Sequence, residues 1–171
     1  MRTDLAALLG ILGLALASMP IYALSSGRRA QDPLDMEDRG SFVLGAFVRS
    51  WLYWFIRPVE RVALGLGLGP LFFNLLGVAF GVLAAWFFAT GRVNPGGWAV
   101  LLGGVADIMD GRIARALGVA SRRGAFLDST LDRFAEFAAF VGLAVLFRSS
   151  ELALILVTTA LGGSLLVSYA R

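Results

Sequence analysis

The stretch DIMDGRIARALGVASRRGAFLDSTLD, residues 107–132, holds four Asp and four Arg. The rest of the chain consists mainly of Leu, Ala, Val, Gly and Phe, and apolar runs flank the stretch on both sides. Charged side chains within or between apolar helices need a partner, a water-filled cavity or a substrate. This stretch therefore decides how the chain can fold and where its chemistry lies.

The overall composition is typical of a membrane protein. Of the 171 residues, 58% are hydrophobic, and the mean hydropathy is +0.78, whereas a soluble domain has about 45–50% apolar residues. A helix needs roughly 20 apolar residues to cross a hydrocarbon core about 30 Å thick. The sequence predicts an all-α, polytopic helical membrane protein with spans at 5–24, 71–90, 97–117, 125–147 and 151–170.

The arginines predict the orientation of these spans. Arg57 and Arg61 precede the second span, the arginines of 107–132 lie around the junction of the third and fourth, and Arg171 follows the fifth. If the spans alternate, these groups share one side, which the positive-inside rule makes the cytoplasm. We expect an integral protein of a bacterial or archaeal-type plasma membrane, with its charged stretch facing the cytoplasm. Nucleic acid is not expected as a partner, because the basic residues sit at the ends of apolar runs.

The sequence predicts one further helix at the N-terminus. Residues 1–27 form an apolar anchor, although the triplet ALA at 15–17 also resembles the cleavage site of a secretory signal. Cleavage there would put the Arg-rich loops outside, so we expect an uncleaved helix. Residues 28–40 are polar and contain Pro33, which predicts a linker.

Residues 41–69 combine aromatic and charged side chains, namely Trp51, Tyr53, Trp54, Phe55, Arg49, Arg57, Glu60 and Arg61. This mixture is typical of an amphipathic helix that lies in the headgroup layer. A loop packed on the membrane domain is the alternative. Glycines and Pro70 then predict a break before the membrane domain at 70–171.

The four acids of the opening stretch fall into two pairs. Asp107 and Asp110 are three residues apart, and Asp128 and Asp132 are four apart, so each pair shares one helix face. Two antiparallel helices can bring all four carboxylates to one point. The alternative is that the acids are ordinary loop residues.

Carboxylates brought together at such a depth repel one another and need cations. The chain has no His and no Cys, so oxygen must hold any metal, which favours hard divalent ions such as Mg²⁺ or Mn²⁺. Two such ions would form the clamp of two-metal phosphoryl chemistry. Gly111, Ala114 and Gly124 leave room for a substrate beside the acids, although small residues also serve ordinary helix packing.

Taken together, these positions resemble the CDP-alcohol phosphatidyltransferases, class I. The family pattern is Asp-x-x-Asp-Gly-x-x-Ala-Arg, followed after a spacer by Gly-x-x-x-Asp-x-x-x-Asp. It stands complete here as Asp107, Asp110, Gly111, Ala114, Arg115, Gly124, Asp128 and Asp132. Members similar to phosphatidylinositol phosphate synthase or phosphatidylglycerophosphate synthase are the nearest in pattern.

The resemblance implies transfer of a phosphatidyl group from CDP-diacylglycerol to an alcohol such as inositol phosphate or glycerol phosphate, with release of CMP. It implies that two divalent ions are held by Asp107, Asp110, Asp128 and Asp132, and that Asp132 also takes the proton of the acceptor. The donor would contact the first three of these acids together with Gly111, Ala114, Arg115 and Gly124. Arg122 and Arg171 would bind an acceptor phosphate, or serve only as cytoplasmic anchors.

Some features depart from the family. Leu71 and Asn74 stand where members commonly have Asn and Thr, which puts the acceptor alcohol in doubt. The family core has six transmembrane helices, whereas this chain has four spans from Leu71 onward. We therefore expect the sequence to lack two C-terminal helices. The bilayer is an expected partner, and a homodimer is compatible with the pattern.

A divalent-cation or proton-coupled membrane transporter is the alternative function, because intramembrane acids also mark ion pathways. Transport needs polar groups spread across the depth of the bilayer. Residues 71–89 contain one such group, Asn74, and the acids all lie toward one side. This asymmetry favours an enzyme at the membrane surface.

Overall fold

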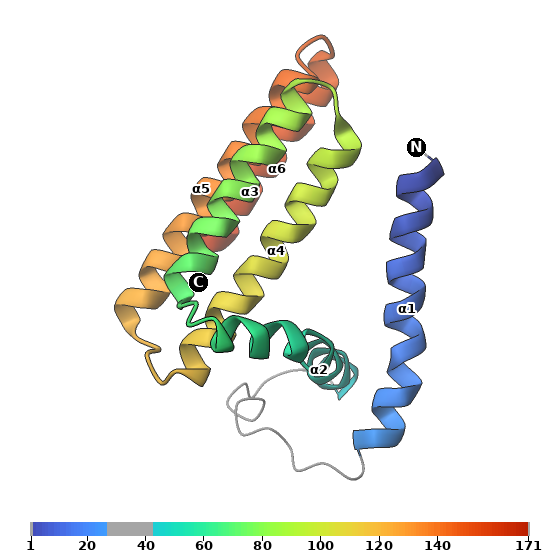
Figure 1. The fold of residues 1–171 in the computed structure, drawn as a ribbon. Helices are drawn as coiled ribbons and strands as arrows, with labels where there is room; N and C mark the ends of the chain where they lie inside the picture. The colour runs from blue at the N-terminus through green and yellow to red at the C-terminus, as the bar shows by residue number, and fades with distance from the viewer. Residues whose placement is uncertain (1, 27–42, 171) are drawn as a thin grey trace. The chain divides into compact units, whose positions relative to one another are not determined.

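The structure, a computed structural model, describes residues 2–26 and 43–170, and every element in them is a helix. In chain order these are α1 (Arg2–Ser26), α2 (Val43–Gly65), α3 (Pro70–Ala89), α4 (Val93–Ala116), α5 (Arg122–Leu146) and α6 (Glu151–Tyr169) (Figure 1). The predicted all-α class is confirmed. The predicted linker, 28–40, lies outside the described residues.

The chain divides into two compact units, one ending at Leu68 and one beginning at Gly69. In the first unit, Trp51 of α2 donates through Nε1 to Oγ of Ser18 on α1, over 2.9 Å. Tyr22 of α1 packs its ring against Phe47 and Trp54, each 5.7 Å away between centroids. A polar contact and an aromatic cluster therefore join α1 to α2.

In the second unit, α3 lies between α4 and α5 and packs against both, as Figure 1 shows. The α3–α5 contact depends on two glycines. A Cβ atom added to Gly81 would lie 2.6 Å from Cα of Ala135, and one added to Gly142 would lie 2.5 Å from Cα of Ala85. Small residues thus let the two backbones touch, as is common between helices in membranes.

Local signals explain where the site-bearing helices begin and end. Pro70 occupies the first turn of α3, where its missing N–H costs nothing. Gly118, with φ of +65°, ends α4 by donating its N–H to the Arg115 carbonyl, while Val119 donates to that of Ala114. Ser121 then caps α5 by accepting from the Gly124 N–H. A short turn therefore joins α4 to α5, and the two helices run antiparallel.

Within the described residues, α3 and α6 are long and apolar enough to cross a membrane. Helix α6 has no buried residue and exposes Leu152, Leu156 and Leu166, as a lipid-facing helix does. The spans predicted at 97–117 and 125–147 form helices α4 and α5, but their charged residues lower their hydropathy. The family core of six spans remains a prediction.

Candidate active site

Three of the four predicted acids meet at one end of the α3–α5 bundle. Carboxylate oxygens of Asp107 and Asp110 on α4 and of Asp128 on α5 all lie within 4.8 Å of one another. The short turn at 117–121 makes this possible, because the end of α4 and the start of α5 then lie side by side. The predicted meeting of two antiparallel helices is thus present in the structure for these three acids.

A residue that the sequence analysis did not assign to the site connects these acids. Asn74 on α3 donates through Nδ2 to Oδ2 of Asp110 at 2.6 Å and to Oδ1 of Asp128 at 2.9 Å. A side-chain amide has two N–H donors, so a single group can serve both carboxylates. Its signal in the sequence was that Asn74 is the one polar residue between Leu71 and Ala89.

The acids differ in their exposure. Asp110 is buried, with 4% of its surface exposed, whereas Asp128 is partly buried and Asp107 is exposed. A carboxylate loses its hydration on burial and needs hydrogen bonds or a cation in return. The Asn74 amide supplies one hydrogen bond to Asp110. The cluster therefore runs from the bundle interior to its surface, open on the side of Asp107.

The donor set of the cluster fits a hard divalent cation. It consists of carboxylate oxygens, which Mg²⁺ prefers, usually in company with substrate phosphate and water. Two like charges about 4 Å apart repel by about 4 kcal/mol at an effective dielectric constant near 20. A divalent ion between the carboxylates would offset this repulsion, so the residues present fit a metal centre.

Asp132 is not one of these three acids but lies against the edge of their cluster. It is one turn beyond Asp128 on α5, is partly buried, and has its carboxyl group next to that of Asp107. The structure thus brings Asp132 to the edge of the site. A direct share in the metal, which the resemblance implies, stays a prediction.

The predicted donor-binding residues surround the acids. A Cβ atom on Gly111 would lie 3.4 Å from Nη1 of Arg115, so the Arg115 guanidinium lies along the backbone at Gly111. The N–H of Gly124 donates to Ser121 Oγ at 3.1 Å in the first turn of α5. Ala114 is partly buried on the turn after Asp110. These residues share the end of the bundle that carries the acids.

Of the two arginines that are expected to bind an acceptor phosphate, the structure describes one. Arg122 is exposed at the first position of α5. Arg171 lies outside the described residues, so the expected pair remains a prediction. Arg112, which was not assigned to the site, is 3% exposed within α4.

Comparison with known proteins gives one family for the second unit. The family model for CDP-alcohol phosphatidyltransferase matches residues 69–171. A protein of Rubrobacter xylanophilus, described as a bifunctional IPC transferase and DIPP synthase, is 43% identical over 61% of this chain and 24% of its own length. The phosphatidylinositol phosphate synthase of Streptomyces avermitilis is 38% identical over 62% of this chain and 44% of its own.

A solved structure is also similar. The crystal structure of Mycobacterium tuberculosis phosphatidylinositol phosphate synthase with CDP-DAG bound matches with a TM-score of 0.57 at 32% identity. The match covers 66% of this chain and 58% of that one. The chain thus spans less than half of the two curated relatives and somewhat more than half of this structure.

Proposed function

The chain belongs to the CDP-alcohol phosphatidyltransferase family, and from this membership we propose that it transfers a phosphatidyl group from CDP-diacylglycerol to an alcohol. The products are a phospholipid and CMP. The observation that carries the proposal is the cluster of Asp107, Asp110 and Asp128, whose carboxylate oxygens lie within 4.8 Å of one another. The motif that the sequence shares with the family consists of these residues and their neighbours.

The proposed acceptor is a phosphorylated inositol. Two proteins similar to this chain are named phosphatidylinositol phosphate synthases, one of them with CDP-DAG bound. A test must distinguish phosphorylated inositol from glycerol phosphate, because both acceptors carry a phosphate group. Arg122 and Arg171 are proposed to hold that phosphate, since a guanidinium offers paired donors to it.

The metal centre is proposed to hold two ions, Mg²⁺ or Mn²⁺, on Asp107, Asp110 and Asp128, with Asp132 completing the set. Such ions, when bound, neutralise the donor diphosphate and stabilise the charge that develops on the leaving phosphate. The chain's own contribution is to hold the carboxylates in place. Asn74 fixes Asp110 and Asp128 relative to each other.

The proposed chemical step is a displacement at the phosphatidyl phosphorus. The acceptor hydroxyl oxygen bonds to that phosphorus, the bond from phosphorus to the CMP oxygen breaks, and CMP leaves with the bonding electrons. Asp132 takes the hydroxyl proton as a general base. Its position beside Asp107, at the edge of the cluster, supports this role.

The remaining motif residues are proposed to bind the donor. Arg115 lies along Gly111, where a guanidinium can meet a phosphate of the diphosphate. The small residues Gly111, Ala114 and Gly124 leave space for the cytidine. The whole site is proposed to open to the cytoplasm, with α2 lying in the headgroup layer and α3 to α6 in the bilayer.

The proposal is tested with purified protein, labelled CDP-diacylglycerol, Mg²⁺ or Mn²⁺ and a panel of alcohols. We expect CMP and a new lipid with inositol phosphate, and at most a small yield with glycerol phosphate or inositol. A product with glycerol phosphate alone would correct the acceptor. The absence of CMP with every alcohol would contradict the proposed reaction. Ion transport would then be the remaining interpretation of the acidic cluster.

A further inference from the structure

Helix α2 carries a cavity of about 480 Å³, lined by Trp54, Phe55, Arg57, Pro58 and Arg61. Its volume is within the range of about 300–1,000 Å³ that is usual for ligand pockets. All five residues belong to the first unit, outside the matched family segment at 69–171. The proposed reaction uses none of them.

The position of these residues on α2 sets the direction in which the cavity faces. Trp54, Pro58 and Arg61 follow one another at spacings of four and three, with Arg57 beside them, and so form one stripe of the helix. The buried residues Ile56, Glu60 and Ala63 form a stripe on the opposite side. The cavity therefore lies on the side of α2 opposite these buried residues, the side on which Trp54 packs against Tyr22 of α1.

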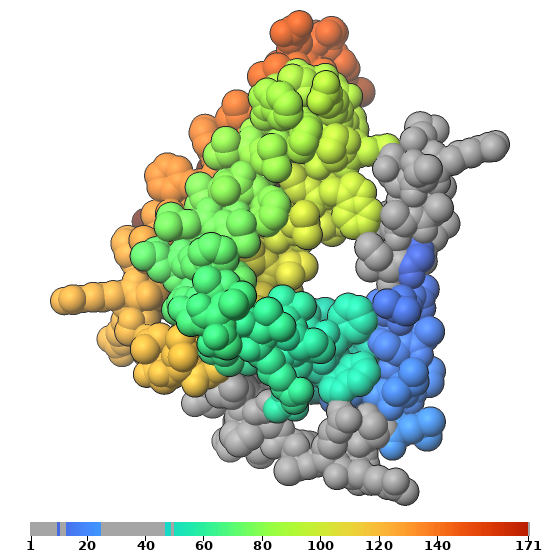
Figure 2. Space-filling view, in the orientation of Figure 1, coloured from blue at the N-terminus to red at the C-terminus, as the bar shows by residue number. Residues whose placement is uncertain are grey.

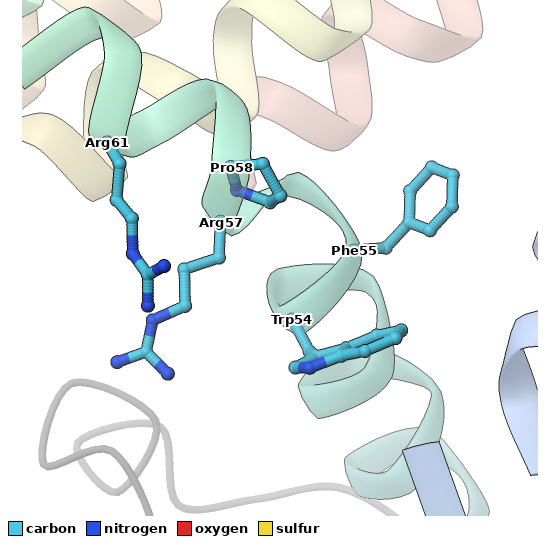
Figure 3. A pocket seen from close by; sticks show the side chains of 5 residues that line it. All are labelled: Trp54, Phe55, Arg57, Pro58 and Arg61. Atoms are coloured by element: carbon cyan, nitrogen blue, oxygen red, sulfur yellow. The ribbon is translucent and has the colours of Figure 1, made fainter. Parts of the chain in front are cut away.

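The charge of this side is positive. Figure 3 shows the side chains of Arg57 and Arg61 extending in the same direction from the helix, with the Trp54 ring beside them. Two guanidinium groups one turn apart can both donate hydrogen bonds to the oxygens of one phosphate. Trp has an apolar body with one N–H and is enriched at the membrane–water interface. The lining thus combines phosphate donors with an aromatic wall.

Pro58 helps to shape the cavity. It has no N–H to donate to the carbonyl of residue 54, and its ring crowds that carbonyl, so a helix bends at such a position. Helix α2 indeed changes direction along its length in Figure 1. The cavity lies at this bend, between Trp54 and Arg61.

We propose that this cavity binds the headgroup phosphate of an anionic glycerophospholipid, with Arg57 and Arg61 on the phosphate and Trp54 against the glycerol region. The lipid, and not a soluble phosphate, is the occupant because the same helix exposes Val62, which lies next to Pro58 at the edge of the charged stripe. The part of α1 that is drawn in blue in Figure 2 exposes Leu14, Leu16 and Leu24. Apolar surface of this kind adjoins acyl chains.

The test measures lipid binding to the purified full chain in micelles by native mass spectrometry. Phosphatidylglycerol and phosphatidylcholine are titrated separately, with a chelator present so that the metal centre does not contribute. We expect the first phosphatidylglycerol to bind at least tenfold more tightly than phosphatidylcholine. We expect the double variant Arg57→Gln/Arg61→Gln to lose this preference, and the control Arg92→Gln/Arg148→Gln, which removes the same charge, to keep it.

Three results would overturn the proposal. The first is equal binding of the two lipids by the parent protein. The second is an unchanged preference in the Arg57→Gln/Arg61→Gln variant, which would place the lipid elsewhere. The third is displacement of the lipid by millimolar glycerol phosphate, which would assign the cavity to soluble phosphates. Because no turnover is measured, failure here is distinct from failure of the proposed reaction.

Discussion

Asn74 on α3 donates to Asp128 on α5 across 2.9 Å. The same amide nitrogen also donates to Asp110 on α4, so one polar side chain in an apolar helix connects the two helices that carry the acids. Three helices therefore form the site: α4 and α5 carry the acids, and α3 carries the amide that contacts them. Because α3 also contacts α5 closely at Gly81, the position of the acids depends on α3 packing as well as on the motif.

Replacement of Asn74 by Leu is expected to weaken metal binding. It removes both hydrogen bonds that orient Asp110 and Asp128, and loss of such supporting contacts typically costs about 10–100-fold in metal affinity. Titration of Mn²⁺, followed by electron paramagnetic resonance, measures the change. The control is Leu75→Val, at an exposed position next to it on α3. Equal Mn²⁺ affinity in Asn74→Leu and the parent would remove Asn74 from the site.

Replacement of Gly81 by Ala is expected to destabilise the second unit. The added Cβ would lie 2.6 Å from Cα of Ala135, so α3 and α5 must move apart, and overpacking of this kind costs about 1–3 kcal/mol. The control Gly163→Ala lies on α6, where an added Cβ meets nothing within 4 Å. Thermal unfolding in micelles should give a lower Tm for Gly81→Ala only. The same Tm for both variants would argue against the close α3–α5 contact.

The orientation can be tested with single cysteines, because the chain has none. Ala120 and Ser149 are exposed and lie in the turns before α5 and after it. We expect an impermeant thiol reagent to label Ser149→Cys in intact cells, and Ala120→Cys only after the membrane is opened. Labelling of Ala120→Cys from outside would reverse the proposed topology.

The acids are expected to differ in role. Asp132→Asn keeps the size of the side chain but cannot take a proton, and loss of a general base typically costs about 10²–10⁴-fold in rate. This variant should still bind a CDP donor in the presence of metal. Asp110→Asn should weaken donor and metal binding together, because it removes charge from the three-acid cluster. Calorimetric titration of a CDP donor into each variant, together with measurement of CMP release, separates the two roles. Turnover by Asp132→Asn near the parental rate would exclude Asp132 as the base.

The sequence predicted the helices and the pairing of the acids on each of two helix faces because both depend on local spacing. Asp107 and Asp110 must share a face of any helix that contains them, and Pro70 and Gly118 mark helix ends through their own backbone preferences. The part played by Asn74 could not be predicted in this way. Its partners lie 36 and 54 residues away, and the contact exists only because α3 packs between α4 and α5.

The same reason explains why contacts within the site and between the helices go beyond the sequence prediction. The spacing of Asp128 and Asp132 predicted one shared helix face, and packing then puts the Asp132 carboxyl group beside that of Asp107, at the edge of the three-acid cluster. The close approach at Gly81 and Gly142 was not predicted either, because glycines are frequent throughout this chain and packing alone shows which of them another backbone meets.

The most direct test of the central claim is the metal dependence of CMP release. Purified protein is stripped with a chelator and given CDP-diacylglycerol with inositol phosphate, and CMP is then measured before and after Mg²⁺ or Mn²⁺ is added. We predict no CMP above background in chelator, release of CMP on addition of metal, and no such recovery in Asp110→Asn at the same metal concentration. Full turnover in chelator would contradict this prediction, because the cluster of Asp107, Asp110 and Asp128 would then not be the metal centre of the reaction.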